Sequence, residues 1–166
     1  MNESATAKSD PERLMLRHTL ATLAYRGGKA VSGAPATFAA FRMNDTTRTP
    51  LEILAHIGDL FDWALHLSEG KSIWKNDAPL SWDEEVARFF KGLTALDERL
   101  ASDAPLGSSV EKLFQGPIAD ALTHVGQINL LRRMAGAPVK GENYFRADIV
   151  AGRVGVDQSA PRVEFD

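Results

Sequence analysis

Two helix-start motifs near the middle of the chain constrain its fold most strongly. Thr49-Pro50-Leu51-Glu52 and Ser81-Trp82-Asp83-Glu84 are capping boxes, in which a hydroxyl residue and an acid three positions later satisfy free backbone N–H groups at a helix start. After each box, apolar residues recur at the three- and four-residue spacing of an amphipathic helix. The pattern therefore predicts one helix from Thr49 to about Gly70, and another that ends before Asp103.

Two further helices are expected on either side of this pair. Asp10 followed by Pro11 is typical of a helix start, and the apolar pattern predicts a helix from Pro11 to about Val31, with a soft spot at Gly27-Gly28. A short turn from Ser108 should meet Pro117, where a kink is expected because proline donates no backbone hydrogen bond. A long helix should follow to about Ala135, with Gly136 just beyond its end.

These four helices, with no convincing alternating strand pattern, predict an all-α fold, a four-helix bundle over residues 10–140. The connection over residues 70–80 is long enough to cross the bundle. Residues 1–9 are small and polar and are expected to be disordered. Residues 141–166 should form an extension that packs on the bundle or is partly irregular, with the aromatics of Asn143-Tyr144-Phe145-Arg146 against it. Four aromatic residues are assigned to the core: Trp63, Phe89, Phe90 and Phe114.

Charge and composition exclude several classes of function. The net charge is −3 and the 19 lysines and arginines are dispersed, so we expect no binding to nucleic acid or to an anionic membrane. The chain has no apolar run of membrane-spanning length and no signal-peptide pattern at its start, so we expect a cytoplasmic protein. It has no cysteine, so any metal must be held by nitrogen and oxygen ligands.

Three polar residues are candidates for such a site. Asp120 and His124 are four positions apart, which places both side chains on one face of the last helix. His56 interrupts the apolar face of the second helix, and helix lengths allow all three to lie at one level if these helices are antiparallel. Two histidines and one carboxylate would leave coordination positions open for water or substrate. The alternatives are a surface ion pair between Asp120 and His124 and an ordinary core histidine at position 56.

The sequence resembles the DinB-like superfamily of small helical metalloproteins. The resemblance rests on His56 early in the second helix and on two potential ligands four apart in the last helix, the second in His124-Val125-Gly126-Gln127. It implies an up-down-down-up bundle with a long crossover between the second and third helices, a divalent metal ion (zinc, nickel or iron) and a homodimer. The family's usual triad is three histidines, so Asp120 departs from it.

Other residues are assigned to the surroundings of this site. Glu52 and Asp59 are within helical reach of His56 and are candidates to orient its imidazole, Trp63 to line a pocket, and Gln127 to lie in the core or beside His124. The resulting hypothesis is an enzyme that activates water or a low-molecular-weight thiol for hydrolysis or transfer to a small electrophile. The alternative is a non-catalytic metal-binding or structural helical dimer with a binding or regulatory role.

Overall fold

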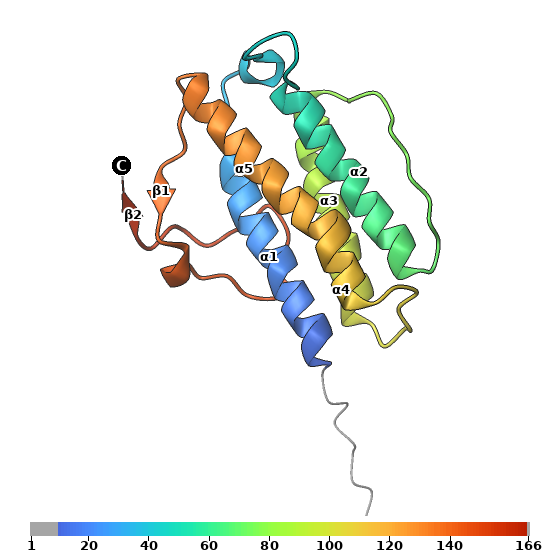
Figure 1. The fold of residues 1–166 in the computed structure, drawn as a ribbon. Coiled ribbons are helices and arrows are strands. Elements are labelled where there is room, and N and C mark those ends of the chain that lie inside the picture. Colours follow the sequence, from blue (N-terminus) through green and yellow to red (C-terminus); the bar gives the residue numbers. More distant parts are fainter. Residues whose placement is uncertain (1–9, 166) are drawn as a thin grey trace, which may run out of the picture.

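The computed structural model describes residues 10–165, and most of this chain is helical (Figure 1). The predicted disorder of residues 1–9 lies outside the described residues. The described chain contains four long helices: α1 (Pro11–Val31), α2 (Pro50–Ser68), α3 (Trp82–Ala101) and α5 (Ala119–Met134). The shorter elements are η1 (Phe38–Ala40), α4 (Val110–Leu113), η2 (Phe114–Ile118), β1 (Gly141–Glu142), η3 (Tyr144–Arg146) and β2 (Glu164–Phe165).

The helix starts follow the predicted caps. The Asp10 carboxylate accepts hydrogen bonds from two backbone N–H groups in the first turn of α1. Both reciprocal hydrogen bonds of the capping box are present between Thr49 and Glu52 at the start of α2, and the equivalent pair is formed at the start of α3. These contacts involve residues only three positions apart, which is why the sequence predicts them well.

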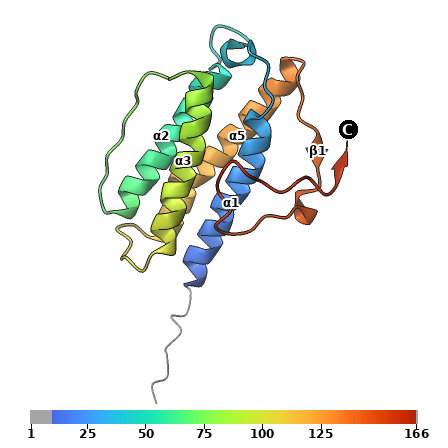
Figure 2. The ribbon, with the colours of Figure 1, turned by 180° about the vertical axis from the view of Figure 1, so that it is seen from behind.

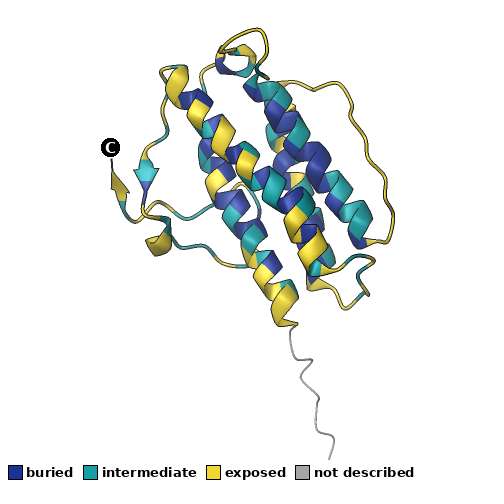
Figure 3. Ribbon diagram, viewed as in Figure 1, coloured by how far each residue is buried: buried dark blue, intermediate teal, exposed yellow. Residues whose placement is uncertain are grey.

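The four long helices pack together around one apolar core. Helices α1 and α2 each pack against both α3 and α5. Figure 3 shows the buried residues on the inward faces of these helices, and the largest fully buried side chains include Phe38, Phe61, Phe89, Leu20, Leu54, Leu93 and Ile118. The connection over residues 69–81 runs back alongside α2, so α3 begins near the end of the molecule where α2 begins (Figures 1 and 2).

The Gly27-Gly28 pair is a close packing point in α1, and the expected soft spot is not seen. Both glycines are buried within a continuous helix. A Cβ atom on Gly27 would overlap the Phe89 ring, and one on Gly28 would lie 3.2 Å from Phe90 Cζ. The absence of side chains lets the two α3 aromatics lie directly on the α1 backbone, which adds buried contact area.

The expected disturbance at Pro117 is a widened helical turn. Residues Phe114–Ile118 form a π-helical turn between α4 and α5, with Pro117 inside it. Such turns contain one extra residue relative to an α-helix and occur as single-turn bulges. The assignment of Phe114 to the core is wrong, because this side chain is 45% exposed. It lies beside the first turns of α1, where Met15 is also exposed.

The C-terminal extension packs on α1, on the side away from α2 (Figures 1 and 2). The buried Glu142 carboxylate accepts a hydrogen bond of 2.6 Å from the Tyr25 hydroxyl and lies 2.9 Å from Lys29 Nζ. Tyr144 packs on Tyr25 and under Arg26, as expected for an aromatic of this segment. Phe145, expected to do the same, is 97% exposed.

Strands β1 and β2 form a short antiparallel pair that the sequence did not predict. Each has two residues, too few to produce an alternating pattern. No helix within residues 10–165 combines the length and the apolar character needed to cross a membrane.

Candidate metal centre

The three predicted ligands converge between α2 and α5. His56, Asp120 and His124 each offer one ligand atom, and these atoms all lie within 4.8 Å of one another. His56 Nε2 is 3.4 Å from Asp120 Oδ2, and the centroids of the two imidazole rings are 4.7 Å apart. The prediction that these residues come together is therefore confirmed. Their side chains are close enough for one ion to contact all three.

The orientation of the His124 ring is set by the preceding helical turn. Its Nδ1 atom lies 2.8 Å from the backbone carbonyl oxygen of Asp120 and 3.2 Å from Asp120 Oδ1. Because both neighbours are hydrogen-bond acceptors, Nδ1 carries the proton in a neutral ring and donates to them. The lone pair is then on Nε2, which is the atom available to a metal ion.

The electrostatic environment favours a neutral imidazole at His56. Its side chain is only 18% exposed. Burial lowers the pKa of His56, and the positive charges of His124 and Arg48 lower it further, whereas Asp120 acts in the opposite direction. A neutral imidazole is the form that binds metal ions. The Asp120 carboxylate is 44% exposed, so the triad is reached from solvent through this residue.

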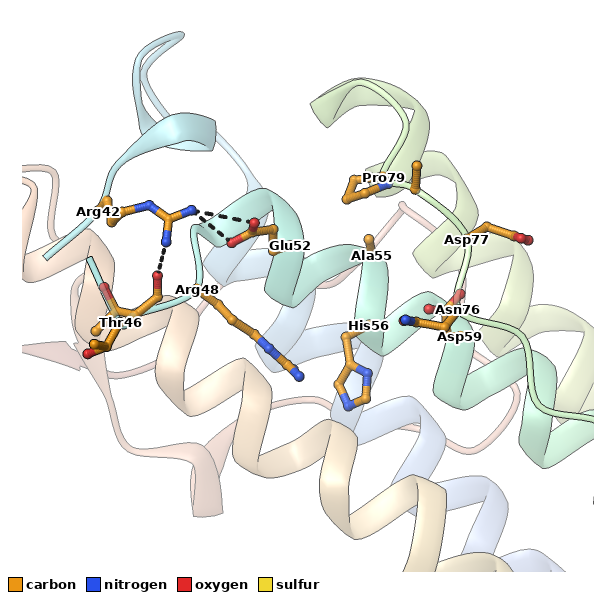
Figure 4. A pocket seen from close by; sticks show the side chains of 12 residues that line it. Arg42, Thr46, Arg48, Glu52, Ala55, His56, Asp59, Asn76, Asp77 and Pro79 are labelled. Atoms are coloured by element: carbon orange, nitrogen blue, oxygen red, sulfur yellow. Dashed lines mark hydrogen bonds and ion pairs between the residues drawn. The ribbon is translucent and has the colours of Figure 1, made fainter. Parts of the chain in front are cut away.

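A polar cavity opens beside His56 (Figure 4). Its volume is about 480 Å³, within the range of small-molecule sites. It is bounded by the start of α2, the segment before it and the connection between α2 and α3. The polar lining residues include Arg42, Thr46, Arg48 and Asn76.

Trp74 brings the long connection into contact with the site. Its ring lies edge-on to His56, with centroids 5.8 Å apart, and also edge-on to Trp63 at 5.6 Å. Trp63, expected to line a pocket, contacts Trp74 but is not among the residues that line the cavity beside His56. Trp74 itself is 46% exposed and forms an apolar wall beside the imidazole.

The two acids expected to orient His56 have other partners. The Glu52 carboxylate accepts a 2.7 Å hydrogen bond from the Thr49 backbone N–H and lies 3.4 Å from Arg42. The hydrogen bond from Thr49 outweighs burial and, with Arg42, lowers the pKa of Glu52. The buried Asp59 carboxylate is 2.6 Å from the Arg88 guanidinium. Both acids line the cavity, but each is paired with an arginine and neither contacts His56.

The two other histidines of the chain, His18 and His66, are not part of this converging group. Gln127 is exposed on α5, so the core position is wrong, and a place beside His124 stays a prediction. His18 is exposed on α1, and His66 is half-buried near the end of α2. The triad is the only group of three or more potential ligands with this compactness among residues 10–165.

Sequence reasoning missed Arg48, Asn76 and Trp74. All three lie in segments without regular secondary structure, so no helical period links them to His56. A tryptophan such as Trp74 in a polar connection only weakly indicates that the connection packs against the helices. Which residue it contacts can be told only when the path of the connection is known. Comparisons of the chain with protein-family models, curated proteins and solved structures find no match.

Proposed function

We propose that His56, Asp120 and His124 bind one divalent metal ion and that the protein is a metal-dependent enzyme of the DinB-like type. The observation that carries this proposal is the convergence of three ligand atoms from two helices to within 4.8 Å. The order of the helices and the returning 69–81 connection support the up-down-down-up topology of that superfamily.

The donor set fits a metal ion. Two donors about 2.1 Å from a tetrahedral ion are about 3.4 Å apart, close to the 3.4 Å between His56 and Asp120. The hydrogen bond at His124 Nδ1 holds that ring with Nε2 free, as is usual for histidine ligands. Two imidazoles and one carboxylate suit zinc, nickel or iron and leave at least one coordination position for water or substrate.

The chemistry we propose is activation of a nucleophile for attack on a small electrophile. A divalent ion held by this triad would supply Lewis acidity, which lowers the pKa of water or of a low-molecular-weight thiol. The chain has no cysteine, so a thiol nucleophile must come from a co-substrate. The residues of the chain orient the ligands, and the cavity of about 480 Å³ beside His56 accepts the reacting molecule.

Metal analysis tests the site. Protein purified without chelators should contain about one equivalent of metal, and His124→Ala should lose it because one of three ligands is removed. His18→Ala is the matched control, because His18 is exposed on α1. Stoichiometric metal in the His124→Ala protein would overturn the three-ligand site.

Turnover is a separate question from binding. Metal-loaded protein should react a small thiol with electrophiles, or hydrolyse simple esters, faster than the His124→Ala protein does. Bound metal with no turnover in either assay, together with unfolding on chelation, would instead support a structural metal site.

We further propose that the protein is a homodimer. The supporting observation is a set of exposed apolar side chains at the start of α1 and of η2: Leu14, Met15 and Phe114 are 45%, 65% and 45% exposed. A second copy covering this surface would bury area that is otherwise in contact with water.

Light scattering should give twice the monomer mass, and Met15→Lys should reduce it to the monomer mass. An unchanged dimer in Met15→Lys but a monomer in Leu130→Lys would move the interface to α5.

A further inference from the structure

One positive charge in the cavity beside His56 is left without a partner. The Arg42 guanidinium is 3.4 Å from Glu52, and Asp59 is 2.6 Å from Arg88, which also contacts Asp62 and Glu85. Both lining acids therefore already have an arginine partner other than Arg48. In the part of the chain that the structure describes, Arg48 makes no ion pair and no side-chain hydrogen bond. Its positive charge is therefore available to a ligand.

The acids nearest to the triad do not neutralise this arginine. The two Asp120 oxygens lie beside His56 and His124, at 3.4 and 3.2 Å. Asp77 also lines the cavity, but Figure 4 shows its carboxylate turned away from His56. The Arg48 side chain, in contrast, extends toward the His56 imidazole in the same view.

The position of Arg48 is fixed by the start of α2. Arg48 immediately precedes Thr49, whose side chain accepts the Glu52 backbone N–H and caps the helix. It lies two helical turns before His56 along the chain, and its charge contributes to the lowered pKa of that imidazole. The guanidinium and the imidazole thus face the same cavity from one helix and its cap.

A lone guanidinium beside a cation site has a clear electrostatic consequence. Arg48 is exposed to solvent on one side and lines the cavity on the other, and it repels a divalent ion at the triad because both are positive. A small anion placed between them is attracted by both. Guanidinium groups bind carboxylates through two parallel hydrogen bonds, which also fixes the orientation of the ligand.

Building on the proposed metal site, we propose that Arg48 binds the carboxylate of a small substrate whose reacting group lies at His56, Asp120 and His124. A single unpaired arginine matches the single negative charge of a carboxylate. The cavity volume of about 480 Å³ suits a small molecule. Ala55, Ala78 and Pro79 in the cavity lining offer apolar contacts for the carbon chain of that molecule.

A pair of matched thiols tests this role. The protein is loaded with Co²⁺, and 3-mercaptopropionate or its neutral amide, 3-mercaptopropanamide, is titrated in at one pH. Thiolate binding to Co²⁺ is followed by its sulfur-to-cobalt charge-transfer absorption. The wild-type protein should bind the carboxylate at least about tenfold more tightly than the amide, as expected for a charge-assisted contact.

Three variants make the result specific. Arg48→Gln should abolish the preference for the carboxylate without changing the affinity for the amide, and Arg48→Lys should retain part of it because the charge is kept. Arg133→Gln, which removes an exposed arginine near the end of α5, should leave the preference unchanged.

The outcomes separate the two proposals. A Co²⁺ spectrum with equal binding of both thiols, or with the same preference in Arg48→Gln, overturns the role of Arg48 and leaves the metal site standing. If Co²⁺ does not bind to the folded protein, the metal site fails and the role of Arg48 fails with it.

Discussion

The Nδ1 atom of His124 lies 2.8 Å from the backbone carbonyl oxygen of Asp120, one helical turn earlier in α5. Asp120 therefore has two separable roles at the candidate site. Its main chain orients the His124 ring, and its side chain is itself a potential ligand. A side-chain substitution at position 120 removes the potential ligand and its 3.2 Å contact with His124 Nδ1, but it keeps the shorter contact of Nδ1 with the main chain.

Asp120→Ala should weaken Zn²⁺ binding by at least about 100-fold, the upper range of losses seen when a group that only orients a ligand is removed. Asp120→His should retain binding, because it supplies a third imidazole at the same place. Isothermal titration calorimetry measures both. Glu98→Ala, which removes an exposed acid on α3, is the control. Wild-type affinity in Asp120→Ala would show that the carboxylate is not a ligand.

Metal binding should stabilise the fold. A ligand present at 100 times its dissociation constant adds about 2.7 kcal/mol to the free energy of unfolding. For a chain of 166 residues this corresponds to an increase in Tm of about 5–10 °C. Differential scanning calorimetry with Zn²⁺, and then with excess chelator, should show the increase and its reversal. His56→Gln should abolish the increase, and its persistence there would contradict the proposed ligand set.

Two glycines inside helices should respond to alanine in opposite directions. Gly27→Ala should destabilise the protein by about 1–3 kcal/mol, because the added methyl overlaps the Phe89 ring. Gly126→Ala should stabilise it by about 0.5–1 kcal/mol, because nothing lies within 4 Å of the added Cβ and alanine favours helix. Urea unfolding of the metal-free proteins measures both changes. Similar values for the two variants would contradict the packing of α1 on α3.

The capping box of α3 should make stability depend on pH in the acidic range. Hydrogen bonds from the Ser81 side chain and backbone lower the pKa of Glu84 in the folded protein. The unfolded chain therefore binds a proton at higher pH than the folded one, so this stabilisation is present above the ordinary pKa and is lost as pH falls through the folded value. Between pH 6 and 3, Tm should fall less in Glu84→Gln than in wild type. Glu98→Gln, on the exposed side of the same helix, should behave as wild type does.

Local sequence patterns predicted the helices and the three converging residues well. The starts of α2 and α3 depend on contacts three residues apart, and the Asp120–His124 pair depends on helical spacing. Comparing helix lengths predicted that His56 lies at the same level as Asp120 and His124. Such a comparison is sufficient when two straight helices pack side by side.

Features that depend on tertiary structure escaped prediction. Glu52 and Asp59 are within helical reach of His56. Their carboxylates instead form ion pairs with Arg42 and Arg88, which come from other segments of the chain. Phe114 is apolar and was assigned to the core, yet the widened turn that contains it directs it outward. Arg48 and Trp74 reach the cavity and the imidazole from irregular segments, whose course is not encoded in a periodic pattern.

The π-helical turn at Phe114–Ile118 acts as a rotational offset in the polypeptide. One surplus residue turns everything downstream by about 100° around the helix axis relative to an uninterrupted α-helix. The face that α4 presents to its neighbours is consequently rotated about the helix axis relative to the face of α5 that carries Asp120 and His124. Shortening this turn by one residue would swing both side chains away from α2 while leaving every amino acid at the triad unchanged.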